Sequence, residues 1–213
     1  MRKGSDSILG FLIRFMHETL GLSPNQISTV GFIVGIVAAA IVVGGMLVPG
    51  LLVLGLSQII DGLDGGVARR YNLQSEKGQM LEVIYDRLNE LAMFLALAFT
   101  GFVSYTMVGL AFIAILLVTI IEPMSQFDPG FKRFMIYFGY LATILFSIRG
   151  FEVAMHVIFF ANLTGFVVGT IMVDYRLQRE IDTQWIARHN TEIAMGIPQP
   201  PDDPPSFLSK LFS

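Results

Sequence analysis

Residues 19–60 read TLGLSPNQISTVGFIVGIVAAAIVVGGMLVPGLLVLGLSQII and include no Asp, Glu, Lys or Arg. One helix needs about 20 apolar residues to cross a bilayer, so this stretch is long enough for two crossings. The dipeptide Pro49-Gly50 is a turn signal that divides it. A second uncharged stretch covers residues 91–121, and the sequence therefore predicts an all-α, polytopic membrane protein. Small residues in the first crossing indicate close helix packing rather than a ligand site, namely Gly31, Gly35, Ala38 and Ala39.

The composition of the whole chain agrees with this class. Of its 213 residues, 54% are hydrophobic and 15% are charged, whereas roughly 25% are charged in a soluble domain. The formal net charge is −3, which argues against nucleic acid as a partner, because binding to a phosphate backbone requires a basic patch. The chain has no cysteine, which excludes disulfides, thiolate metal sites and cysteine nucleophiles.

Turn residues divide the apolar sequence into six expected membrane spans, an even number that places both termini on one side of the membrane. Of the 14 Lys and Arg residues, 13 then fall on the side of the termini, and only Arg149 falls on the other. Basic residues are enriched on the cytoplasmic side, so we expect a multi-pass protein of the inner membrane with cytoplasmic termini. The expected spans are residues 25–47, 50–69, 79–101, 105–124, 133–149 and 152–174.

The two ends of the chain differ from its middle. Residues 5–20 indicate an amphipathic helix on the cytoplasmic membrane surface, with a flexible leader as the alternative. We therefore divide the chain into an interfacial helix at 1–22, a membrane domain at 23–175, and a cytoplasmic helix with a flexible tail at 176–213. The expected apolar face of the first helix consists of Ile8, Phe11, Leu12, Phe15 and Leu20.

Acidic residues cluster where the second expected span ends and the third begins. Asp61 and Asp64 are three residues apart, and Glu82, Asp86 and Glu90 are spaced by four, so each set lies on one face of its helix. Charged groups in a span are costly and usually face a polar cavity. Clustered carboxylates without Cys or paired His favour Mg²⁺, Mn²⁺ or Ca²⁺. The alternative is that these are helix-end charges at the interface, paired with nearby arginines.

Small residues and an arginine lie between the two acidic sets, in the run Gly65-Gly66-Val67-Ala68-Arg69. Gly and Ala leave room for a ligand close to the backbone, and the guanidinium of Arg69 matches the geometry of a phosphate. Carboxylates, a divalent cation, small residues and an arginine together indicate a site that handles a pyrophosphate.

This arrangement resembles the signature of the CDP-alcohol phosphatidyltransferase family, D-x2-D-G-x2-A-R-x8-G-x3-D-x3-D. Every spacing agrees, seven of the eight fixed residues are identical, and the resemblance covers residues 5–175. Glu82 departs from the pattern, because the family has Asp there. One extra methylene moves the carboxylate by about 1.5 Å, so altered metal preference, slower turnover or an inactive relative all follow as alternatives. The matching residues are Asp61, Asp64, Gly65, Ala68, Arg69, Gly78, Glu82 and Asp86.

The resemblance implies that an acceptor hydroxyl attacks the lipid-side phosphorus of a CDP-activated alcohol, usually CDP-diacylglycerol, and that CMP leaves. It implies two divalent ions, Mg²⁺ or Mn²⁺, on the pyrophosphate, with the site at the cytoplasmic interface. Asp86 would also be the general base on the acceptor hydroxyl. We further expect a homodimer. The implied metal ligands are Asp61, Asp64, Glu82 and Asp86, and the implied nucleotide and phosphate contacts are Gly65, Ala68 and Arg69.

The acceptor is left open by the sequence. The run at residues 86–90, Asp-Arg-Leu-Asn-Glu, resembles the inositol and inositol-phosphate branch, and glycerol 3-phosphate is the alternative acceptor. Lys132 and Arg133 could bind an acceptor phosphate, or they could be positively charged anchors on the cytoplasmic side.

Other functions are also compatible with parts of the pattern. A catalytically weak family member acting as a partner subunit is one, because of Glu82. A membrane prenyltransferase would carry two Asp-rich motifs on more spans, and a transporter would carry its charges nearer the middle of a span.

Overall fold

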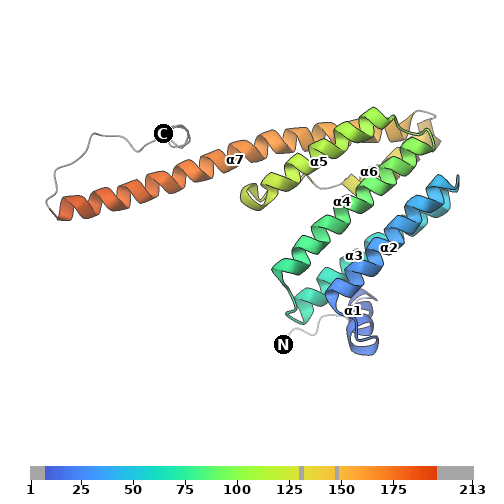
Figure 1. The fold of residues 1–213 in the computed structure, drawn as a ribbon, viewed down its shortest axis with the longest axis horizontal. Coiled ribbons are helices and arrows are strands. Elements are labelled where there is room, and N and C mark those ends of the chain that lie inside the picture. The colour runs from blue at the N-terminus through green and yellow to red at the C-terminus, as the bar shows by residue number, and fades with distance from the viewer. Residues whose placement is uncertain (1–7, 130–131, 147–148, 196–213) are drawn as a thin grey trace. The chain divides into compact units, whose positions relative to one another are not determined.

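The computed structural model describes residues 8–129, 132–146 and 149–195 (Figure 1). Every regular element within these ranges is a helix, which confirms the predicted all-α class. The elements are α1 (Ile8–Arg14), the π-helical turn η1 (Phe15–Thr19), α2 (Pro24–Val43), α3 (Leu47–Arg70), α4 (Glu76–Phe99), α5 (Tyr105–Ser125), α6 (Lys132–Phe146) and α7 (Gly150–Ala194).

Four of the described helices are long and apolar enough to cross a membrane: α2, α3, α5 and the Gly150–Arg188 part of α7. The other two expected spans correspond to α4 and α6. α4 begins with several charged residues, and α6 has 15 residues, about 22 Å of helix against a hydrocarbon core of about 30 Å. The chain is therefore an integral membrane protein with several apolar helices, and the count of six spans stays a prediction.

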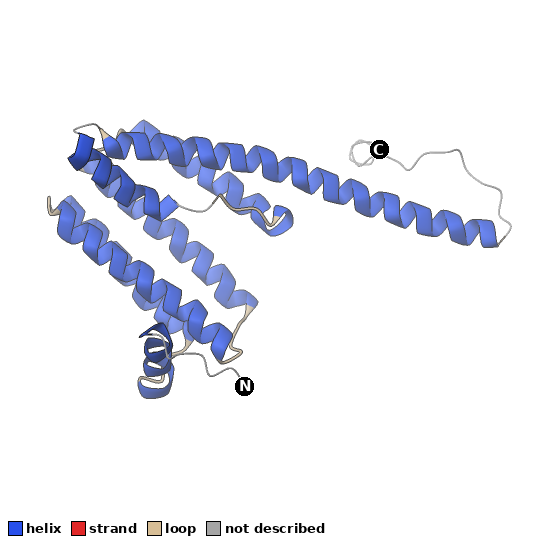
Figure 2. Cartoon of the chain, turned by 180° about the vertical axis from the view of Figure 1, so that it is seen from behind, coloured by secondary structure: helices blue, strands red, loops and turns tan. Residues whose placement is uncertain are grey.

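α7 is a single helix of 45 residues (Figure 2). The expected last span at 152–174 and the charged helix after it are thus parts of one continuous element. Within α7 the side chains change from apolar to charged after Val173, while the helical backbone continues to Ala194.

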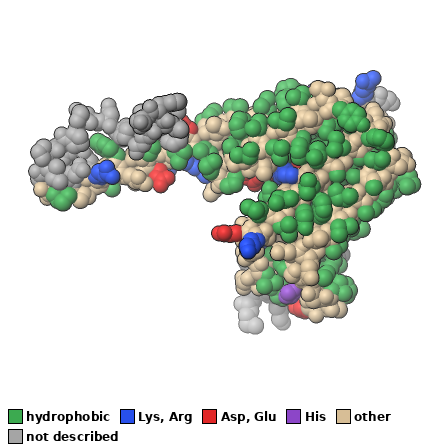
Figure 3. All heavy atoms as spheres, in the orientation of Figure 1, with side chains coloured by type: hydrophobic (Ala, Val, Ile, Leu, Met, Phe, Trp, Pro, Cys, Tyr) green, Lys and Arg blue, Asp and Glu red, His purple; other side chains and the backbone are tan. Residues whose placement is uncertain are grey.

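Hydrophobic side chains cover much of the visible helix surface, and charged side chains are few there (Figure 3). Leu52, Ile120 and Phe146 are among the most exposed, at 72%, 68% and 70%. Contiguous apolar surface of this kind is rare in soluble monomers. The exposed apolar surface is therefore suited to lipid.

The turn between α2 and α3 lies earlier than Pro49-Gly50. α2 ends at Val43, Gly45 has a φ of +84°, and α3 begins at Leu47. Glycine takes up this left-handed conformation because it lacks a Cβ. Pro49 lies in the first turn of α3, where its missing N–H costs no helical hydrogen bond. The prediction that Pro49-Gly50 ends the first span was therefore wrong.

The described residues form two compact units. The first contains α1 to α4, α6 and the adjoining ends of α5 and α7, and the second contains the remaining parts of α5 and α7. In the second unit, Gly169 of α7 allows Ile121 and Ser125 of α5 to approach, and Arg176 donates a hydrogen bond to the Met124 carbonyl at 3.1 Å.

In the first unit, α2 packs closely on α3 and α4 through its small residues. Ser57 of α3 donates a hydrogen bond to the Gly31 carbonyl at 2.8 Å. A Cβ on Gly35 would lie 2.5 Å from Oδ1 of Asn89 in α4, so only glycine admits this side chain. The predicted packing role of the small residues is confirmed, because all of them are buried: Gly31, Gly35, Ala38 and Ala39.

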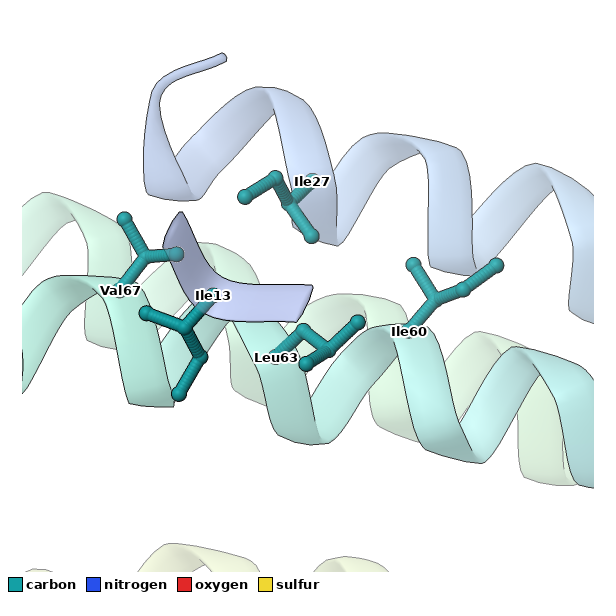
Figure 4. Packing of buried hydrophobic residues seen from close by; sticks show 5 residues of the cluster. All are labelled: Ile13, Ile27, Ile60, Leu63 and Val67. Carbon is teal, nitrogen blue, oxygen red and sulfur yellow. The ribbon is translucent and has the colours of Figure 1, made fainter. Parts of the chain in front are cut away.

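The N-terminal helical segment packs on α2 and α3 through Ile13 (Figure 4). Gly66 makes this contact possible, since a Cβ there would lie 2.6 Å from Ile13 Cδ1. The Tyr71 hydroxyl also donates a hydrogen bond to Glu18 at 2.6 Å. Ile13 was not part of the expected apolar face. Of that face, Phe11, Phe15 and Leu20 are exposed, Leu12 is half-buried, and the side chain of Ile8 lies outside the described residues.

Candidate active site

The acidic motif occupies the end of α3 and the start of α4. After α3, Asn72 has a φ of 53°, a left-handed conformation that Asn tolerates better than most residues. Ser75 caps α4, because its Oγ accepts a hydrogen bond from the Gly78 amide at 3.1 Å. α2 packs against both helices and thereby brings the two halves of the motif to one place.

A cleft of about 130 Å³ lies where α2, α3 and α4 meet. Five of the seven predicted site residues line it: Asp64, Gly65, Ala68 and Arg69 from α3, and Glu82 from α4. The remaining lining residues are Pro24, Asn25 and Ser28 of α2, the connection at 73–75, and Gly78 and Gln79 of α4. Asp61 and Asp86 are not among them.

Asp64 is the most buried of the predicted metal ligands, with 3% of its surface exposed. Its carboxylate accepts hydrogen bonds from the Ser28 hydroxyl of α2 and from the Gly65 backbone amide. A buried carboxylate requires such donors because it has lost its hydration. Ser28 therefore links α2 to the acidic motif through a hydrogen bond.

Two glycines of the motif lie where other side chains approach the backbone. A Cβ on Gly65 would lie 3.2 Å from Nη1 of Arg69, so the guanidinium lies over Gly65 at the wall of the cleft. A Cβ on Gly78 would lie 3.0 Å from Oδ1 of Asn25. A side chain at either position would displace a polar group that faces the cleft.

Arg133 of α6 bridges the two predicted ligands that lie outside the cleft lining. Its Nη1 donates a hydrogen bond to Asp61 Oδ2 at 2.8 Å, and its Nη2 forms an ion pair with Asp86 Oδ1. The side chains of Arg133, Asp61 and Asp86 are 20%, 25% and 26% exposed, so the bridge is partly shielded from solvent. Asp61 and Asp86 are thus brought together by a cation that belongs to the chain.

Glu90 differs from the other acids. It is 5% exposed and pairs with Arg87 of the same helix at 2.6 Å. Glu90 lies well inside α4 rather than at its end, and the neighbouring Arg87 balances its charge. Asp64, by contrast, has neutral hydrogen-bond partners.

The four predicted metal ligands do not form a ready-made metal site. Within the described part of the chain, no three His, Asp or Glu side chains gather closely enough to hold a metal ion as they stand. Asp61 and Asp86 instead contact Arg133, while Asp64 contacts Ser28 and a backbone amide.

The chemistry of this donor set nevertheless fits a hard divalent cation. Asp64 and Glu82 line the same cleft, and Asp61 and Asp86 contact the same guanidinium, so carboxylates from both halves of the motif lie close enough to repel one another. Carboxylate oxygens are the ligands that Mg²⁺ and Mn²⁺ prefer, and a cation among these groups would relieve the repulsion.

Sequence reasoning missed Ser28 and Asn25 and left the role of Arg133 open. Ser28 is one of several polar residues at the start of a largely apolar helix, which is a weak signal. Arg133 is 72 residues from Asp61 in the chain, and no local pattern joins the two.

Comparison with known proteins gives one family. The family model described as CDP-alcohol phosphatidyltransferase matches residues 21–172. Inner membrane protein YnjF of Escherichia coli (strain K12) is 35% identical over 83 residues, which are 39% of this chain and 37% of that protein. An archaetidylinositol phosphate synthase of Pyrococcus horikoshii is 28% identical over 96 residues, or 45% of this chain and 50% of that protein. The chain thus spans between a third and a half of the length of these relatives.

Among solved structures, the chain is similar to phosphatidylinositol phosphate synthase from Mycobacterium tuberculosis with CDP-DAG bound. The TM-score is 0.66 at 16% sequence identity, and the match covers 78% of this chain and 93% of that one. At this identity the likeness shows a common fold.

Proposed function

Because the chain belongs to the CDP-alcohol phosphatidyltransferase family, we propose that it transfers the phosphatidyl group of CDP-diacylglycerol, or the related group of another CDP-alcohol, to an acceptor hydroxyl and releases CMP. One observation carries this proposal: a single cleft is lined by Asp64, Gly65, Ala68, Arg69 and Glu82 of the signature.

The cleft supplies what a cytidine diphosphate requires. The Arg69 guanidinium would contact a phosphate, since it lies over Gly65 at the wall of the cleft. Ala68 would leave room for the nucleotide. Asn25, Ser28 and Gln79 add hydrogen-bonding groups to the same cleft.

Asp86 would act as the general base. It would accept the proton of the acceptor hydroxyl while that oxygen bonds to the lipid-side phosphorus, and the bond from this phosphorus to the CMP oxygen would break. Asp86 follows Glu82 of the cleft lining by one turn of α4, and this spacing supports the proposed role.

Asp61, Asp64, Glu82 and Asp86 would hold divalent metal, Mg²⁺ or Mn²⁺. When bound, such ions supply positive charge to the pyrophosphate and to the departing CMP. The chain contributes the carboxylates and, through Ser28 and the Gly65 amide, the orientation of Asp64.

For the acceptor we propose inositol or an inositol phosphate, with glycerol 3-phosphate as the alternative. The run at residues 86–90 and the two archaetidylinositol phosphate synthases among the relatives support the first choice. The test is CMP release by the purified protein from CDP-diacylglycerol with inositol, inositol phosphate, glycerol 3-phosphate or serine. Release with none of these acceptors, under metal-replete conditions, would contradict the proposal.

We propose that the protein crosses the inner membrane six times, with both termini and the active site cytoplasmic and the segment at 1–22 on the membrane surface. Residues 23–175 would form the membrane domain and 176–213 a cytoplasmic helix and tail, and the protein would be a homodimer. The charge distribution of 13 basic residues to one supports the orientation.

The orientation predicts opposite labelling at Arg149 and Lys77. The chain has no cysteine, so each can be replaced by Cys without a background signal. A membrane-impermeant maleimide applied to intact cells should label Arg149→Cys and should label Lys77→Cys only after lysis. Labelling of both, or of Lys77→Cys alone, in intact cells would be incompatible with this topology.

A substitution at Glu82 tests whether the site is adapted to the longer side chain or whether its catalytic activity is weakened by it. If the site is adapted to the longer side chain, Glu82→Asp withdraws the carboxylate by about 1.5 Å, and we expect CMP release to fall about 10- to 100-fold. Glu76→Asp is the matched control, because Glu76 is exposed at the start of the same helix. Higher activity in Glu82→Asp would instead identify the chain as a weakened relative.

A further inference from the structure

Helix packing places Arg133 opposite the acidic motif. Arg133 lies in the first turn of α6, and one turn later the Tyr137 hydroxyl donates a hydrogen bond to the Leu51 carbonyl of α3 at 3.2 Å. Tyr137 also lies against Gly55, where a Cβ would be 3.3 Å from its hydroxyl oxygen. The neighbouring Ile136 is 2% exposed. The contact of α6 with α3 thus directs Arg133 toward Asp61.

The guanidinium of Arg133 holds one carboxylate from each half of the motif, Asp61 of α3 and Asp86 of α4. The planar, forked guanidinium can serve two carboxylates at once, which an ammonium point charge does less well. Glu90 adds a further negative charge that acts on Arg133. An anchor for lipid headgroups would extend to the membrane surface, whereas this side chain is 20% exposed and faces the acids.

We propose that Arg133 is a built-in substitute for the divalent cation, which bridges Asp61 and Asp86 in the metal-free protein and must leave them before both can bind metal. The proposal rests on the proposed function, because it takes these two residues as ligands. A cation coordinated by both carboxylates competes with the guanidinium for the same oxygens. When no metal ion is bound, the arginine offsets the repulsion among the acids and stabilises the fold.

Competition lowers the apparent affinity for metal. When only a fraction of the protein has its ligands free, the apparent dissociation constant is the intrinsic one divided by that fraction. If about nine molecules in ten are in the bridged state, removal of Arg133 tightens metal binding about tenfold. Removal of Arg133 also leaves Asp61 and Asp86 without a positively charged partner when no metal is bound.

The experiment uses the purified full-length chain in detergent and two readouts besides activity: Mn²⁺ binding followed by electron paramagnetic resonance, and the melting temperature in EDTA. Arg133→Gln should bind Mn²⁺ about tenfold more tightly than wild type and melt at a lower temperature in EDTA. Its melting temperature should also rise more than that of the wild type when Mn²⁺ is added. Arg133→Lys keeps the charge but loses the fork, so it should also bind Mn²⁺ more tightly. Arg70→Gln, which removes an exposed arginine at the end of α3, should stay within twofold of wild type.

Three results would overturn the proposal. Equal or weaker Mn²⁺ binding by Arg133→Gln is the first. The second is wild-type affinity in Arg133→Lys, or equal tightening in Arg70→Gln, since either would mean that only overall charge matters. The third is absence of Mn²⁺ binding in every variant, which would contradict the metal site of the proposed function itself and is thereby distinguished from the other two.

Discussion

Replacement of Asp61 or Asp64 by Asn is expected to lower the rate of CMP release by about 10³-fold or more. Each change removes the charge of a proposed metal ligand, and loss of a single preorganised electrostatic contact to a transition state already costs about 10²- to 10³-fold. CMP release by purified variants with CDP-diacylglycerol is the measurement. Asp174→Asn is the matched control, because it makes the same chemical change at an exposed position on α7.

The two variants should differ in stability. Asp64 is 3% exposed and accepts hydrogen bonds from Ser28 and the Gly65 amide, so an Asn there introduces two N–H donors, of which the Ser28 hydroxyl can accept one. An unsatisfied buried polar group costs about 1–3 kcal/mol, and the melting temperature of Asp64→Asn should fall accordingly. The side chain of Asp61 is 25% exposed, which makes Asp61→Asn the cleaner test of activity.

Removal of the metal should have the same effect as removal of its ligands. Excess EDTA is expected to stop CMP release by the wild-type protein, and Mg²⁺ or Mn²⁺ should restore it. Full activity in excess EDTA, or wild-type rates in both Asn variants, would exclude the proposed metal-dependent mechanism.

Asp86→Asn is expected to reduce turnover by at least 10²-fold, and by as much as about 10⁴-fold. The amide has the shape of the carboxylate and its oxygen can still accept a hydrogen bond from Arg133, but it cannot take a proton from the acceptor hydroxyl. The side chain of Asp86 is 26% exposed, so we expect little change in melting temperature. The measurement is single-turnover CMP release at saturating acceptor.

Glu76→Gln provides the control for Asp86→Asn, because it removes an exposed carboxylate from the first turn of the same helix. We expect it to lower the free energy of unfolding by only about a few tenths of a kcal/mol, which is what a charge contributes at a helix N-terminus. Turnover near the wild-type level in Asp86→Asn would remove Asp86 from the role of base and would leave it, at most, a partner of Arg133.

The class of the protein and one wall of its cleft could be predicted from sequence because both depend on local spacing. Uncharged runs longer than a bilayer crossing require apolar helices. Residues spaced by three and four lie on one helical face, so Asp64, Gly65, Ala68 and Arg69 reach the same cleft. Glu82 joins them because α4 begins soon after α3 ends and its Gly78 lies against Asn25 at the start of α2.

The turn after α2 and the packing face of the N-terminal segment were predicted wrongly, because in each case more than one residue could form the turn or make the contact. A proline is tolerated in the first turn of a helix, so Pro49 did not end the first span, and Gly45 made the turn instead. A helix with apolar residues around much of its circumference can pack through any of them. Ile13 packs on α3 because Gly66 leaves space there, and this depends on a helix more than 50 residues further along the chain.

What the sequence by itself determined is therefore the all-α membrane class, the family signature and the residues of α3 and α4 that face one cleft. Only the tertiary structure decided what those residues contact. Ser28 on Asp64 joins positions 36 residues apart, and Arg133 on Asp61 joins positions 72 apart. Such contacts depend on which helices are neighbours and at which depth each side chain lies, and both are set by close packing at glycines and by the balance of buried charge.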